Sequence, residues 1–177
     1  MALAEVGAFF QKYVFGFIFT DIKREIALVS TPSGGGNLLA ALGLLCYTEV
    51  LGGVDRWTWE QGQGSANFNA FLDRMGPAYQ AFRQKVNVYK VFRCGMAHEY
   101  GTKQPCVVEM TRGTAPCGLY EDGGKLHFNV EAYFTDFAAA AQALHQEMQG
   151  RPSPALPPPV KEHRGIPDEA CGPSSRP

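Results

Sequence analysis

The spacing of apolar residues predicts helices along most of the chain. Between Phe9 and Ile26, large apolar residues recur every three or four positions, which places an aromatic-rich stripe on one face of a first helix. A second stripe begins at Asn37, a residue suited to cap a helix, and we expect this helix to end at Gly52-Gly53. Residues 54–66 then have the polar, glycine-rich pattern of a loop.

Three more helices are predicted beyond this loop. A third helix has apolar residues from Phe68 to Met75 and is interrupted at Gly76-Pro77. A fourth runs from about Val86 to His98. In the last helix, which Asn129 can cap and which ends at Gly150, apolar residues again repeat at helical spacing.

Short segments with strand character precede the last helix. They are Val107–Thr111, Gly118–Glu121 and Lys125–Val130, and Asp122-Gly123-Gly124 between the last two is a hairpin signal. The sequence therefore predicts a mainly α fold, an up-and-down bundle of about five helices with a small β-hairpin inserted before the last helix.

Composition divides the chain at residue 150. We expect residues 1–149 to form one helical domain, because the remaining segment, 150–177, holds eight of the twelve prolines and few large aliphatic residues. Such a segment buries too little surface to offset its ordering entropy, so a flexible tail is predicted. Its triple proline, Pro157–Pro159, is either a spacer or a polyproline ligand.

Length, cysteine content and hydropathy narrow the class of protein. The 177 residues suit one domain plus a tail. Five scattered cysteines, an odd number, argue against a disulfide scaffold and favour a reducing, cytoplasmic location. The longest apolar run near the start, Tyr13–Phe19, has seven residues, whereas a membrane span needs about 20. We therefore expect no membrane partner and no secretory signal.

The formal net charge of −1 conceals segments of opposite sign. Residues 1–73 carry −3 and residues 113–149 carry −4, whereas the segment from Arg74 to Arg112 carries +5. The total excludes a protein that coats nucleic acid by bulk charge. The cationic segment could line a phosphate-binding cleft or could spread over solvated faces, with tyrosines available for base stacking, namely Tyr79, Tyr89 and Tyr100.

The residues of catalytic type lie in this cationic segment, between Tyr89 and Tyr100. Arg93 can hold a phosphate in a bidentate fork, and His98 can donate or accept a proton near neutral pH. On an ideal helix the two are ~7.5 Å and ~140° apart, so they do not share one face. A long arginine side chain could still converge on the histidine, and a symmetric dimer would place two such pairs around one cleft. The alternative is two solvated residues at a helix end.

Arginine and histidine are sufficient for RNA cleavage without a metal. A base removes the proton of a ribose 2′-hydroxyl, a cation stabilises the charge on the phosphoryl oxygens, and an acid protonates the leaving 5′-oxygen. A Cys3His zinc set from Cys94, His98, Cys106 and Cys117 has the wrong spacing and no Cys-x2-Cys. We therefore predict neither a metal nor a cofactor.

The order Arg93, four residues, His98, one residue, Tyr100 resembles the extended Arg-x4–6-His motif of the HEPN superfamily, whose domains are small helical bundles that dimerise with the motif at the interface. The resemblance implies a homodimeric, metal-independent endoribonuclease, with Arg93 and His98 as the catalytic pair. It also implies a place in toxin–antitoxin or other defence systems, with an antitoxin or a nucleotidyltransferase as partner.

The same resemblance gives neighbouring residues a role. Lys90, Cys94, Tyr100 and Lys103 are then substrate-binding candidates, and Tyr100 is either a modification site or a phenol packed on the hairpin. Active members usually have a small polar residue after the arginine, whereas this chain has Cys94, whose thiol is a weaker hydrogen-bonding group. The alternative function is therefore a catalytically inactive HEPN-like module that binds RNA, a nucleotide or a partner protein.

Overall fold

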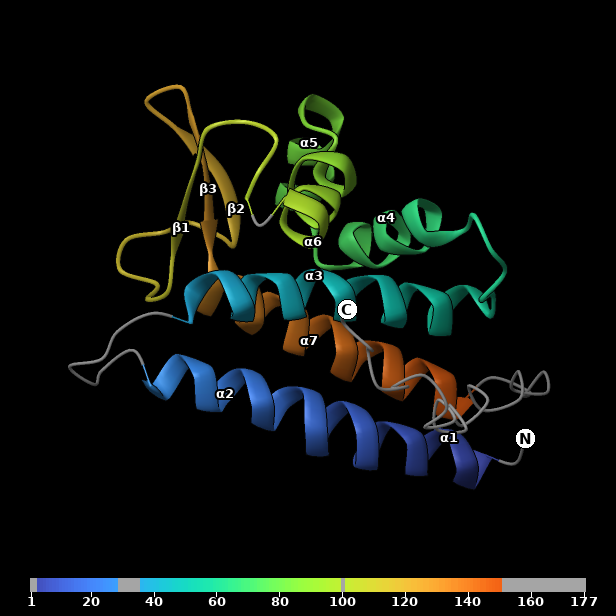
Figure 1. Cartoon of the computed structure of the whole chain (residues 1–177). Helices are drawn as coiled ribbons and strands as arrows, with labels where there is room; N and C mark the ends of the chain where they lie inside the picture. The colour runs from blue at the N-terminus through green and yellow to red at the C-terminus, as the bar shows by residue number, and fades with distance from the viewer. Residues whose placement is uncertain (1–2, 29–35, 100, 151–177) are drawn as a thin grey trace, which may run out of the picture.

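The structure is a computed structural model that describes residues 3–28, 36–99 and 101–150. The predicted tail from residue 151 onward and Tyr100 lie outside these residues. Helices and strands follow one another along the chain as Figure 1 shows, with these bounds: α1 Leu3–Phe9, η1 Phe10–Ile18, α2 Phe19–Leu28, α3 Asn37–Arg56, α4 Gly64–Arg74, α5 Pro77–Lys85, η2 Tyr89–Cys94, α6 Gly95–Glu99, β1 Cys106–Glu109, β2 Leu119–Asp122, β3 Lys125–Asn129 and α7 Val130–Gly150.

The first helix is continuous through α1, η1 and α2, and its middle part, η1, is π-helical. Phe10, Val14 and Ile18 are buried at four-residue intervals. A π turn holds more residues than an α turn, so this spacing keeps all three on the face that packs against the core. Tyr13 and Phe17, which the stripe also contains, are exposed.

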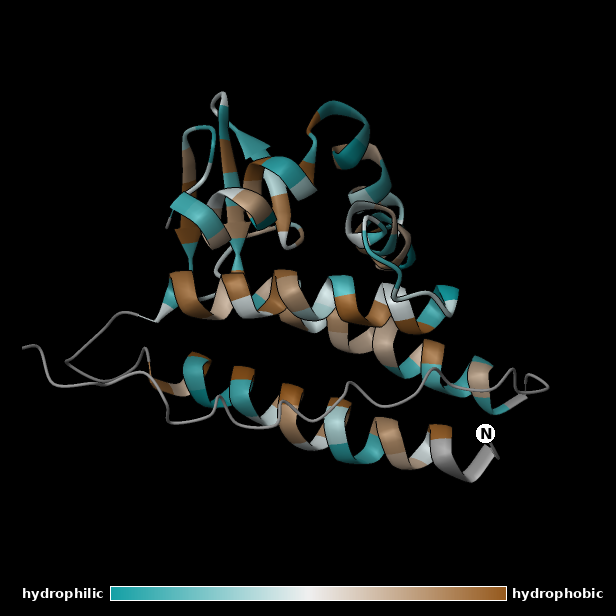
Figure 2. Cartoon of the chain, turned by 45° about the vertical axis from the view of Figure 1, so that its right-hand side comes forward, coloured by the Kyte–Doolittle hydropathy of each residue, from teal (hydrophilic) through white to brown (hydrophobic). Residues whose placement is uncertain are grey.

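Helix α3 is the central element of the fold. It contacts α2, α4 and α7, and it lies between the first helix and the upper layer of short helices and sheet (Figure 1). Apolar residues run along much of its length (Figure 2). By length and composition alone α3 could cross a membrane, but half of that window is buried inside the protein, and core helices pass the same test. The absence of a membrane partner stays a prediction.

The mainly α fold is confirmed, but the number of helices and the strand arrangement differ from the prediction. Six continuous helices, rather than about five, occur among the described residues, since α1, η1 and α2 form one helix and η2 and α6 another. The predicted hairpin is present as β2 and β3, and Gly123 and Gly124 at its turn have φ of 55° and 74°. It belongs to a three-stranded sheet, because β1 pairs in parallel with β3.

Asn129 caps α7 as predicted. Its Oδ1 accepts the N–H of Ala132 at 2.9 Å, and its Nδ2 donates to the carbonyl of Thr111 at 2.6 Å. One buried side chain therefore provides a hydrogen-bond partner both for the start of the helix and for a loop carbonyl. Asn37 does not cap α3. It lies in the first turn, and its Nδ2 donates to the Val108 carbonyl at 2.9 Å, which ties α3 to the sheet.

The prediction that Gly52-Gly53 ends the second helix is wrong, because α3 continues to Arg56. Helix α4 crosses α3 at these glycines, and a Cβ at Gly52 would lie 1.8 Å from the backbone oxygen of Asn67. Gly52 therefore permits a close backbone approach, and neither glycine ends the helix.

This crossing predicts a large effect of a single methyl group. Gly52→Ala should lower the free energy of unfolding by ~3 kcal/mol, because backbone atoms, and not a flexible side chain, occupy the space that the methyl group needs. The measurement is equilibrium urea unfolding.

Gly43→Ala on the same helix is the matched control. A Cβ there would make ordinary contact with Ile22 at 3.5 Å, so a gain of ~0.5–1 kcal/mol from the better helix former is expected. Equal effects of the two substitutions would contradict the close crossing.

Candidate functional site

The helix that carries the candidate motif, formed by η2 and α6, is held by its apolar side. Val88, Phe92 and Met96 are buried at four-residue intervals, and the Phe92 ring packs near the rings of Phe82 and Phe128. This packing orients the two remaining flanks of the helix, one toward α3 and one toward solvent.

Arg93 lies on the flank toward α3 and is paired with a carboxylate. Its Nε donates to Oε2 of Glu49 at 2.8 Å, and each of the two side chains is 23% exposed. Burial opposes the charge of the guanidinium, but Glu49 stabilises it, and the pKa of Arg93 is held above its ordinary value. Among the described residues, no hydrogen bond engages the two terminal amino groups of Arg93.

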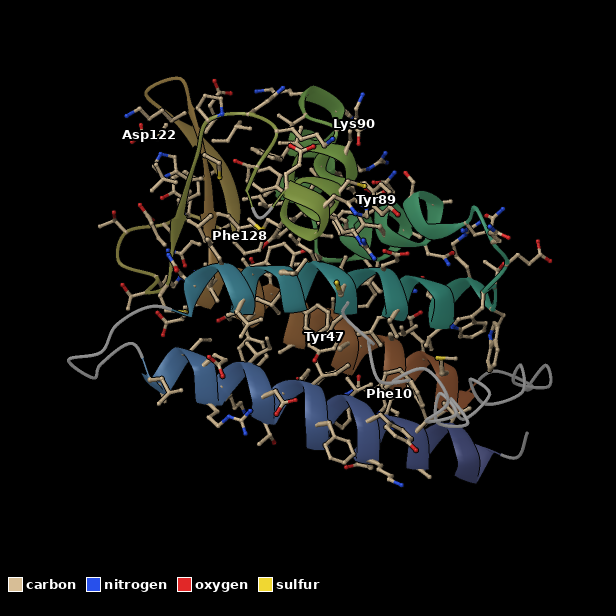
Figure 3. The ribbon with its side chains drawn as sticks, in the orientation of Figure 1. Phe10, Tyr47, Tyr89, Lys90, Asp122 and Phe128 are labelled. Atoms are coloured by element: carbon tan, nitrogen blue, oxygen red, sulfur yellow. The ribbon has the colours of Figure 1, made fainter. Side chains whose placement is uncertain are left out.

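Two further groups surround this ion pair. The guanidinium carbon of Arg93 lies 5.9 Å from the centre of the Tyr89 ring, and Tyr89 sits over α3 (Figure 3). A Cβ at Gly64, the first residue of α4, would lie 2.5 Å from Oε1 of Glu49 and 2.7 Å from the hydroxyl of Tyr89. The start of α4 therefore confines both side chains that face Arg93.

His98 lies apart from this cluster. It is exposed near the end of α6, and no hydrogen bond or ion pair engages it within the part of the chain that the structure describes. No such contact joins it to Arg93 either. Within one chain, the structure brings Arg93 together with Glu49 and Tyr89, and it leaves His98 open to solvent.

The other predicted site residues lie around the same helix. Lys90 is exposed and points away from α3 (Figure 3), whereas Cys94 is partly buried. Nζ of Lys103 pairs with Glu99 at 2.8 Å. The loop that carries Lys103 packs closely on the helix, since a Cβ at Gly95 would lie 2.6 Å from the carbonyl oxygen of Gly101. Tyr100 lies outside the described residues.

The cationic segment does not form a bare basic surface. Four of its seven cations pair with carboxylates: Arg74 with Asp55 and Glu147, Arg83 with Asp73, Arg93 with Glu49, and Lys103 with Glu99. Most of these carboxylates come from the acidic segments on either side in sequence. The local charge is therefore lower than the sequence count of +5 indicates.

Of the tyrosines considered for base stacking, Tyr79 is unavailable. It is 1% exposed, and its hydroxyl donates to Asp136 at 2.6 Å and accepts the N–H of Gly118 at 2.9 Å. Tyr79 therefore joins α5, α7 and the sheet in the core.

Glu49 and Cys46 are site residues that the motif did not indicate. A signal for Glu49 was present, because it is the only charged residue between Asn37 and Val54 on an otherwise apolar helix. Burial raises the pKa of the Cys46 thiol, Arg93 lowers it, and Glu49 raises it. Cys46, Glu49 and Arg93 therefore form one electrostatic cluster.

The described residues contain no group of three or more His, Cys, Asp or Glu side chains placed to hold a metal ion. Cys94, His98, Cys106 and Cys117, considered as a zinc set, do not gather in this structure.

The reactivity of Cys46 tests this cluster without any assay of activity. Glu49→Gln removes a contribution that raises the pKa of the thiol, so alkylation of Cys46 by iodoacetamide at pH 8 should become a few fold faster. Arg93→Gln removes the opposing contribution and should slow it. Peptide-resolved mass spectrometry measures each rate, and Cys117, whose pKa neither group influences, is the internal control. Equal Cys46 rates in both variants would contradict the arrangement.

The comparisons with known proteins identify no relative of the chain. No family model, no curated protein and no solved structure matches the chain.

Proposed function

We propose that this protein is a metal-independent endoribonuclease of HEPN type, in which Arg93 binds the scissile phosphate and His98 transfers protons. The observation that carries the proposal is the way in which Glu49 holds the guanidinium of Arg93. Glu49 engages its Nε at 2.8 Å, which fixes the plane of the guanidinium and leaves the two terminal amino groups for a bidentate contact with phosphate.

The proposed reaction uses the ribose itself as nucleophile. A base removes the 2′-hydroxyl proton, the 2′-oxygen attacks the adjacent phosphorus, and the bond from phosphorus to the 5′-oxygen breaks. An acid protonates the departing 5′-oxygen, so the products carry a 2′,3′-cyclic phosphate and a 5′-hydroxyl. Arg93 stabilises the negative charge that builds on the phosphoryl oxygens, while His98 supplies the base or the acid.

A second copy of the chain completes the site in this proposal. Arg93 faces α3 and His98 faces solvent, so the second proton-transfer group comes from a symmetry-related His98 across a two-fold axis. Lys90, Cys94, Lys103 and Tyr100 then border the bound RNA. The up-and-down HEPN-like bundle, a cytoplasmic location, a toxin or defence role, and an antitoxin or nucleotidyltransferase partner are parts of the same proposal.

Cleavage of RNA in excess chelator tests the proposed chemistry. Labelled single-stranded RNA should yield cyclic-phosphate ends, and His98→Ala or Arg93→Ala should lower the rate by at least ~100-fold, since each removes one group of the reaction. His127→Gln, which alters a histidine on the sheet, is the matched control and should retain the rate. Intact RNA, or cleavage that survives His98→Ala, would refute the proposal.

A second candidate function is a binding module without catalysis. The Arg93–Glu49 ion pair and the Cys94 thiol favour it, because the first reduces the local positive charge and the second is a weak hydrogen-bonding group. Binding of 2′-O-methyl RNA that depends on Arg93, with no turnover of the unmodified RNA, is the result expected for this module.

A further inference from the structure

The first helix carries a row of three aromatic rings, of which the first is half-buried against the core and the other two are exposed to solvent. Phe9, Tyr13 and Phe17, called the aromatic row below, are four residues apart. Their ring centres are 5.6 Å and 6.0 Å from one to the next. Tyr13 is 47% exposed and Phe17 is 56% exposed, whereas Phe10 and Val14 on the neighbouring face are buried. Contiguous exposed aromatic surface of this kind marks a binding surface.

The described part of the chain ends close to this row. Helix α7 packs against α1, and near its end His145 stacks on Phe10 with ring centres 4.9 Å apart. Phe10 is in turn 5.6 Å from Phe9, the first ring of the row. The chain therefore leaves α7 at Gly150, about one helical turn beyond His145, beside the N-terminal end of the row.

The sequence that follows Gly150 suits an aromatic surface. Ala155-Leu156-Pro157-Pro158-Pro159-Val160 combines a triple proline with flanking aliphatic residues, and such segments adopt the polyproline II conformation at a low entropic cost and dock on aromatic surfaces. Six residues in this conformation span about 19 Å. The row extends over nine residues, from Phe9 to Phe17, and spans about 12 Å, so the segment is long enough to cover all three rings.

Because the segment belongs to the same chain as the row, even a weak contact is sufficient to keep it bound. Only the residues from 151 to 154 separate the helix end from the proline-rich segment, and a short flexible linker gives an effective concentration in the millimolar range. A segment whose isolated Kd is ~0.1 mM would then be bound about ten times as often as free. A free peptide of the same sequence would bind too weakly to matter.

We propose that the segment 155–160 of the chain's own tail docks on the aromatic row formed by Phe9, Tyr13 and Phe17. Trypsin cleavage in the full-length protein tests this docking. The bonds after Lys161 and Arg164 adjoin the segment, while proline follows Arg151 and protects that bond. Cleavage of the docked tail should be ~10-fold slower than in a synthetic tail peptide of the same sequence.

Variants on both sides of the contact sharpen the test. Tyr13→Ser with Phe17→Ser should bring the cleavage rate to that of the peptide, and replacing Pro157–Pro159 with glycine should do the same against its own peptide. Combining the two sets should have no additional effect, because both remove one interaction. The circular dichroism spectrum of each variant checks that the helices are retained. We expect them to be, because Tyr13 and Phe17 are exposed.

Trp59→Ser, at an aromatic side chain outside the row that is 42% exposed, is the matched control and should leave protection unchanged. Tail cleavage as fast as in the peptide, protection that survives loss of the row, or protection that depends on Trp59 would each overturn the proposal. Protection that falls when the protein is diluted would overturn it as well, because a second copy of the chain would then be the occupant.

Discussion

The close crossing of α3 and α4 determines the geometry on which the candidate site depends. Because Gly52 has no side chain, the backbone of α4 reaches α3 directly at Asn67. Gly64, the first residue of the same helix, lies against both Glu49 and Tyr89. The two side chains beside Arg93 thus pack against a helix whose position depends on a contact between backbones.

The ion pair between Arg93 and Glu49 has two opposing consequences. It lowers the net positive charge that a phosphate would meet, which weakens a purely electrostatic attraction. It also holds a long side chain in one orientation, so that less conformational entropy is lost when a ligand binds. Because Glu49 engages Nε, the pair lowers the net positive charge of the site. No hydrogen bond within the described residues engages the two terminal amino groups of the guanidinium. In the proposed function, an arginine held in this way would favour selective recognition of one phosphate over general affinity for nucleic acid.

Local signals in the sequence predicted the local features of the fold. The Asn129 cap, the break at Gly76-Pro77 and the turn at Gly123-Gly124 each depend on residues within a few positions of one another. The Arg93–Glu49 pair joins residues 44 positions apart, and no periodicity or spacing rule contains that distance. The parallel pairing of β1 with β3 was missed for the same reason.

Prediction from the sequence failed for a second reason at Gly52-Gly53 and at Tyr79. In each case the residue type is compatible with two environments, and tertiary packing decides between them. Glycine pairs end helices, but they also allow helices to cross closely. A tyrosine offers a stacking face, but its hydroxyl equally satisfies buried groups, as Tyr79 does for Asp136 and Gly118.

Both π-helical segments coincide with large apolar residues repeated every four positions. In an α-helix such a repeat drifts by ~40° per step, whereas a wider turn absorbs the drift and keeps Val88, Phe92 and Met96 on the core side. The same repeat places Arg93 on one flank and His98 on the next. Because η2 ends at Cys94 and Gly95–Glu99 is α-helical, most of the interval from Arg93 to His98 has α geometry, and their angular separation stays near the ~140° of an ideal helix. In the proposed function, a phosphate bound to Arg93 would therefore meet the proton-transfer group of a second copy more readily than His98 of the same chain.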